Sequence, residues 1–103
     1  MSPKDRDGWR RLAPDVWMRT LRSSTHPIEY ATILVVLREG RLHNVRVFDN
    51  SHGPEEHHEH RFRSDEKLPP TITYGPVNSP LNAAETKIMR HWRAMVLSWE
   101  RTR

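Results

Sequence analysis

The fold of this chain is decided by one stretch near its centre, EYATILVVLR, at residues 29–38. It is rich in β-branched side chains and almost continuously apolar, which is typical of a strand with both faces covered. Glu39-Gly40 follows it, and a second β-branched run, RLHNVRVFDN, occupies residues 41–50. Two such runs joined by a short turn containing glycine predict a β-hairpin in the middle of a sheet.

Shorter runs on either side of this hairpin extend the predicted sheet. We expect one strand before it, over residues 15–22, and two after it, over residues 57–63 and 71–74. The intervening segments carry Pro, Gly and Ser, which favour loops. The strands therefore follow one another along the chain with short connections, as in an antiparallel meander.

The last segment has the spacing of an amphipathic helix. Asn82 and Glu85 fit a capping box, and Ser79-Pro80 offers a competing start one turn earlier. Apolar residues then recur at steps of three and four, namely Leu81, Ile88, Trp92, Met95 and Trp99. The sequence thus predicts an α+β fold in which an antiparallel sheet of four to five strands is covered by one C-terminal helix.

Length and composition limit the domain organisation. The chain has 103 residues, 35% of them hydrophobic, which leaves room for one small core. Residues 1–13 are polar and include Pro3 and Gly8, so we expect a flexible N-terminal arm followed by one α+β domain over residues 14–103.

The chain contains no cysteine. That composition excludes disulfide scaffolds, cysteine-type zinc fingers and thiol enzymes, and it is usual in a reducing compartment. The longest apolar run, at residues 31–37, is far shorter than the roughly 20 residues of a membrane span. The N-terminus has no apolar segment behind its charges, so we expect a cytoplasmic protein without a membrane partner.

Charge is unevenly distributed along the chain. The net charge is +4, but residues 49–70 carry three basic against six acidic side chains together with four of the seven histidines. Both flanking segments are basic, and 14 of the 17 basic residues are arginine. Arginine binds phosphate through two-point contacts and stacks on bases, so an arginine-rich surface suits RNA or DNA, although codon usage in a GC-rich genome gives the same bias.

Residues 49–60 hold four His, three Glu and one Asp. Three interpretations compete for this segment. In a strand, His58 and His60 share one face, and with His52 or Asp49 they make a plausible metal site of three ligands. His and Glu also suit metal-independent acid–base cleavage of RNA, with arginine as the phosphate clamp. The third interpretation is a solvated, polar sheet edge.

The segment also carries a family resemblance. The second hairpin strand ends in Arg46-Val47-Phe48-Asp49-Asn50, Gly53 follows closely, and His58-Glu59-His60 comes next. Together with the Trp-containing helix at the end, this pattern resembles the TumE-type toxins of bacterial toxin–antitoxin pairs. The resemblance covers about residues 29–63, and the final helix agrees in type.

The resemblance implies growth inhibition through action on RNA, and neutralisation by a partner antitoxin. It makes Asp49, Asn50, His58 and His60 the candidate catalytic residues of a metal-independent endoribonuclease that needs no cofactor. The candidate nucleic-acid-binding residues near this segment and on the helix are Arg46, Arg61, Arg63, Arg90 and Arg93.

Two alternatives remain open. The chain could be a non-enzymatic binding module of a mobile element or phage that contacts nucleic acid or a protein through arginine-rich faces. It could instead be a metal-binding protein that uses the His/Glu cluster, with His52, His58 and His60 as ligands. Four Trp in a small core also favour some surface exposure of Trp17 and of Trp92 or Trp99, which is compatible with a homodimer.

Overall fold

The computed structural model describes residues 6–25, 27–74 and 79–102. Within them, seven strands precede one helix. These elements are β1 (Arg6–Ala13), β2 (Val16–Arg22), β3 (Tyr30–Arg38), β4 (Arg41–Asp49), β5 (Glu56–Arg63), β6 (Glu66–Lys67), β7 (Thr71–Tyr74) and α1 (Pro80–Arg101).

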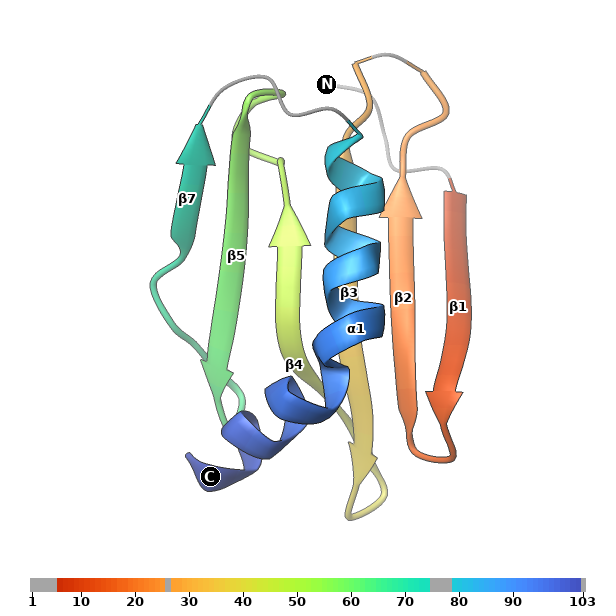
Figure 1. The fold of residues 1–103 in the computed structure, drawn as a ribbon, viewed down its shortest axis with the longest axis vertical. Coiled ribbons are helices and arrows are strands. Elements are labelled where there is room, and N and C mark those ends of the chain that lie inside the picture. Colours follow the sequence, from red (N-terminus) through yellow and green to blue (C-terminus); the bar gives the residue numbers. More distant parts are fainter. Residues whose placement is uncertain (1–5, 26, 75–78, 103) are drawn as a thin grey trace.

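The strands form an antiparallel meander, with β1 to β5 side by side in chain order (Figure 1). β4 lies along one side of β5, while on the other side β6 pairs with its C-terminal end and β7 with its N-terminal half. Helix α1 crosses one face of the sheet (Figure 1). The predicted α+β fold is confirmed, with more strands than the four to five expected.

The central hairpin forms as predicted. β3 lies between β2 and β4, and Leu34 and Val36 have no exposed surface. Arg38 pairs with Arg41 across the turn, and both turn residues have positive φ, 55° at Glu39 and 75° at Gly40. Positive φ at both positions matches the right-handed twist of the flanking strands, so this tight turn fixes the register of the hairpin.

Residues 6–13 differ from the expected flexible arm. They form β1, which pairs with β2 from Arg6 opposite Arg22 to Ala13 opposite Val16. The side chains from Arg6 to Arg11 are all exposed, so the strand has no apolar alternation that would mark it in the sequence. Residues 1–5 of the expected arm lie outside the described residues.

Helix α1 begins at Pro80, at the earlier of the two predicted starts. The capping box at Asn82 does not form. Glu85 instead accepts a hydrogen bond from the Thr20 hydroxyl of β2 at 2.8 Å, because its side chain faces the sheet. Across the described residues, no helix is both long enough and apolar enough to span a membrane.

The core lies between α1 and one face of the sheet. Its helix side consists of Ala84, Ile88, Met95, Val96 and Trp99. These side chains pack on buried residues of β2, β3 and β4, among them Val16, Met18, Leu34, Val36, Val45 and Phe48. Of the other tryptophans, Trp17 and Trp92 are half-buried and Trp9 is exposed. The tryptophan expected at the surface from the helix is therefore Trp92 and not Trp99.

An ion-pair network fastens β5 to β4 and to the helix. Glu59 of β5 receives hydrogen bonds from Arg46 of β4 at 2.6 Å and from Lys87 of α1 at 2.7 Å. Burial alone would raise the pKa of Glu59, but the hydrogen bonds and positive charges of Lys87 and Arg46 outweigh it and lower that pKa. The carboxylate therefore stays ionised and holds three elements together.

We predict that Ile88→Ala lowers the free energy of unfolding by about 2–5 kcal/mol, because it empties a fully buried site under the helix. Leu97→Ala on the same helix is the matched control, since Leu97 is 48% exposed and should change stability little. Urea denaturation followed by circular dichroism measures both variants. Equal effects of the two substitutions would contradict the assigned helix face.

We also predict that Glu59→Gln destabilises the fold at pH 7 by about 2 kcal/mol, since it removes a charged acceptor from Arg46 and Lys87. The lowered pKa means that ionised Glu59 stabilises the folded state above its unfolded pKa of about 4.3, and that this contribution is lost as pH falls further. The difference between parent and variant should therefore shrink in acid. A difference that stays constant from pH 7 to pH 3 would disprove this role.

Candidate functional site

The pairing of β4 with β5 decides which side chains share a face. Phe48 pairs with Glu59, and Lys87 of α1 contacts both side chains. Because successive side chains of a strand point to opposite faces, the adjacent pair, Asp49 and His58, points away from the helix. We call this side of the sheet the helix-free face.

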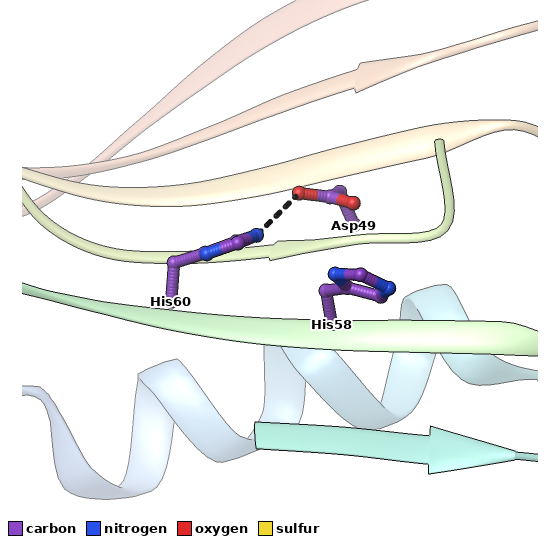
Figure 2. A group of neighbouring side chains, drawn as sticks. All are labelled: Asp49, His58 and His60. Atoms are coloured by element: carbon purple, nitrogen blue, oxygen red, sulfur yellow. Dashed lines mark ion pairs between the residues drawn. The ribbon is translucent and has the colours of Figure 1, made fainter. Parts of the chain in front are cut away.

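Asp49, His58 and His60 form a compact group on the helix-free face, which we call the His/Asp cluster. One possible ligand atom from each residue lies within 4.8 Å of the other two, and the three side chains point toward one another (Figure 2). The closest pair is Nε2 of His60 and Oδ2 of Asp49, which are 3.6 Å apart. The residues are 7%, 6% and 5% exposed, respectively, so the cluster is largely removed from water.

Two neighbouring residues, Ser51 and Glu56, orient this cluster. The backbone N–H and hydroxyl of Ser51 donate hydrogen bonds to Oδ1 of Asp49 at 3.2 and 3.0 Å. Glu56 places Oε1 at 2.8 Å from Nε2 of His58. In contrast, Nδ1 of His58 and both ring nitrogens of His60 are buried and have no hydrogen-bond partner among the described residues.

The surroundings of His60 favour its neutral form. Burial is the main cause that lowers its pKa, and the positive charge of Lys67 adds to this effect. Asp49 and the Leu68 backbone act in the opposite direction but do not outweigh them. A neutral imidazole carries a lone pair, so His60 is suited to accept a proton or to bind a metal ion.

Tyr30 adds a buried hydroxyl near the cluster. Burial, together with the negative charge of Asp49, raises the pKa of Tyr30 to about 12. The phenol therefore keeps its proton at neutral pH, and its oxygen lies 3.2 Å from Nδ1 of His57. The charge of Asp49 thus acts to raise the pKa values of both Tyr30 and His60.

Asn50 has a positioning role in the structure. Its side-chain oxygen accepts a hydrogen bond from the backbone N–H of Tyr30 at 2.9 Å, and its amide nitrogen donates to the Ile28 carbonyl at 2.8 Å. Both contacts tie the end of β4 to the segment that enters β3. Asn50 therefore fixes the backbone next to Asp49 and has its amide atoms already engaged.

A pocket of about 320 Å³ lies beside the cluster. It is lined by residues 27–29 and 50–54, and the exposed His52 forms part of its wall. The His52 ring stacks on His58, with ring centroids 4.5 Å apart and an angle of 19° between the rings. His52 thus connects the pocket with the buried histidines.

The candidate nucleic-acid-binding arginines are not gathered around the cluster. Arg46 is buried and paired with Glu59. Arg61 is Arg46's cross-strand partner and lies on the helix side of the sheet. Arg63, at the end of β5, and Arg90 and Arg93, on α1, are exposed. In the described part of the chain, these arginines offer surfaces apart from the His/Asp cluster.

Sequence reasoning missed three residues of the site, Ser51, Glu56 and Lys67. Glu56 had a usable signal, because it lies two residues before His58 in a strand and so shares its face. Ser51 follows Asp49 by two residues, the spacing of a local side-chain turn. Lys67 had none, since its effect on His60 depends on the β5–β6 hairpin.

The geometry permits two kinds of chemistry. Two imidazoles and a carboxylate can act as proton acceptor, proton donor and orienting group. The same set can bind a divalent transition-metal ion, for which two histidines and one carboxylate are common protein ligands. Comparison of the chain with protein-family models, curated proteins and solved structures gave no match.

We predict that Asn50→Ala lowers the free energy of unfolding by about 1–3 kcal/mol, because it leaves the buried N–H of Tyr30 and the partly buried carbonyl of Ile28 without their partners. Asn44→Ala, at an exposed position of β4, is the control and should have little effect. Thermal and urea denaturation measure both variants. If Asn50→Ala is as stable as the parent, the positioning role is wrong.

Proposed function

We propose that the protein is a small toxin-like enzyme that cleaves RNA, with Asp49, His58 and His60 as its chemical centre. The observation that carries this proposal is the convergence of these three side chains on the helix-free face, away from the core. Burying polar side chains costs free energy, so their burial in a cluster is better explained by a role in catalysis or binding than by a contribution to stability.

Cleavage of RNA at the ribose 2′-hydroxyl fits this residue set. A base takes the 2′-hydroxyl proton, the 2′-oxygen bonds to phosphorus, and the bond to the 5′-oxygen breaks as that oxygen takes up a proton. Neutral His60 is suited to the first proton transfer, and His58, hydrogen-bonded to Glu56, to the second. Lys67, whose charge acts on His60, would contact the phosphate.

The pocket beside His52 gives the substrate a place to bind. It is lined by Ser51 and His52, which contact Asp49 and His58, and the exposed His52 ring can stack on a base as it stacks on His58. An enzyme acting on cellular RNA works in the cytoplasm, and a growth-inhibiting one requires a neutralising partner. We therefore propose an antitoxin protein as its partner in the same cell.

We predict that His58→Gln and His60→Gln each relieve the growth arrest caused by expressing the chain and reduce RNA cleavage by the purified protein at least 100-fold. His91→Gln changes an exposed histidine on α1 and should leave both effects intact. Circular dichroism confirms that the variants are folded. The assignment of the site fails if both cluster variants arrest growth as strongly as the parent.

A binding module without catalysis is the second candidate, favoured by the exposed arginines. Arg93 stacks on Trp92 with its guanidinium carbon 4.5 Å from the ring centroid. Arg90 is exposed on the same helix, and Arg61 and Arg63 are exposed on β5. RNA binding that weakens steeply with salt, without cleavage of any RNA tested, would support this candidate over the enzyme.

A further inference from the structure

Each residue of the His/Asp cluster has at least one hydrogen-bonding atom that its neighbours leave available. Ser51 occupies Oδ1 of Asp49, which leaves Oδ2. Glu56 occupies Nε2 of His58, which leaves Nδ1. Nε2 of His60 lies 3.6 Å from Oδ2 of Asp49, and no described residue forms a hydrogen bond with it.

Buried polar atoms without a partner are rare in folded proteins, because each loses its hydration without replacement. His58 and His60 are both more than nine-tenths buried, each has an unpartnered ring nitrogen, and one ring nitrogen of each lies within 4.8 Å of an Asp49 carboxylate oxygen. A solvated sheet edge does not account for this arrangement. A bound cation would satisfy both imidazole lone pairs and the carboxylate at once.

The second layer of contacts has the form that metal sites use. A metal-binding histidine usually directs its other ring nitrogen to a carboxylate or carbonyl, which fixes the ring and makes it a better ligand. Glu56 stands in this relation to His58, at 2.8 Å. Ser51 holds the carboxylate of Asp49 in the same way.

We propose that Asp49, His58 and His60 bind one divalent transition-metal ion, with Zn²⁺ the best match to two nitrogens and one oxygen. Bonds of about 2.0–2.2 Å around one ion set ligand atoms roughly 3.5 Å apart, close to the 3.6 Å between His60 and Asp49. Three protein ligands leave a further position for water or substrate oxygen.

Of the two third ligands expected from the sequence, His52 and Asp49, this site uses Asp49. The His52 ring lies face to face with His58, so it covers the cluster from the pocket side. The metal site is a separate proposal from RNA cleavage, and the binding of an ion can be measured without RNA. If the protein does cleave RNA with the ion bound, the coordinated imidazoles would no longer be free to transfer protons, and the ion would instead supply positive charge and a bound water beside Asp49 and Glu56.

The test begins with full-length, tag-free protein stripped of metal by a chelator. Calorimetric titration with Zn²⁺ should give one ion per chain, and Co²⁺ should produce visible absorption bands of a site with nitrogen ligands. Mg²⁺, which prefers oxygen ligands, should not compete. Absence of saturable binding of one Zn²⁺ or Co²⁺ per chain would overturn the proposal.

Two neighbouring glutamates give a matched comparison for the second layer. Glu56→Gln should weaken Zn²⁺ binding about 10–100-fold, because it removes the carboxylate behind His58. Glu55→Gln changes the exposed adjacent residue and should leave the affinity unchanged. Equal affinity for both variants would count against the site.

A ligand variant completes the test. His60→Gln should abolish Zn²⁺ binding, whereas His91→Gln should not. If His60→Gln does not fold, the comparison of Glu56 with Glu55 decides. RNA cleavage is assayed in parallel. Zn²⁺ binding without cleavage supports the metal site and rejects the enzyme. Cleavage that persists in EDTA, in a protein that does not bind Zn²⁺, supports the enzyme and rejects the metal site.

Discussion

The antiparallel register of β4 and β5 is the constraint on which both the core and the site depend. Phe48 and Glu59 stand opposite each other on the helix side, where Phe48 joins the core and Glu59 binds Arg46 and Lys87. The next pair, Asp49 and His58, then faces the other way. A slip of one residue in either strand would break these pairs and invert that strand's faces. The Glu59 network thus also fixes which histidines meet Asp49.

Much of the architecture could be predicted from local patterns. The apolar run of β3 and the turn at Glu39-Gly40 define the central hairpin, and the apolar repeat from Ile88 to Trp99 defines the helix face. β1 could not be predicted, because its exposed side chains have no periodicity and its strand form depends on pairing with β2. The sequence offered two helix starts, and it could not show that Glu85, which the later start would use in a capping box, binds Thr20 across the fold instead.

The residues of the candidate site could be predicted from the sequence, but their hydrogen bonds and ion pairs could not. Alternation in a strand brings His58 and His60 to one face, and the pairing of β4 with β5 adds Asp49. The sequence could not show that Asn50 uses its amide for backbone contacts, or that Arg46 is buried beside Glu59. Both residue types suit catalysis or nucleic-acid binding when exposed, and only the tertiary contacts reveal their positioning roles.

The His/Asp cluster and its supporting groups are drawn from a short segment, with Asp49, Ser51, Glu56, His58 and His60 all contained within twelve residues. Closing so short a loop costs little chain entropy, and its contacts have low sequence separation. Core contacts such as Thr20 with Glu85 join residues 65 apart. The candidate site is therefore built mainly from contacts that are local in the sequence, whereas the core depends on contacts between distant segments.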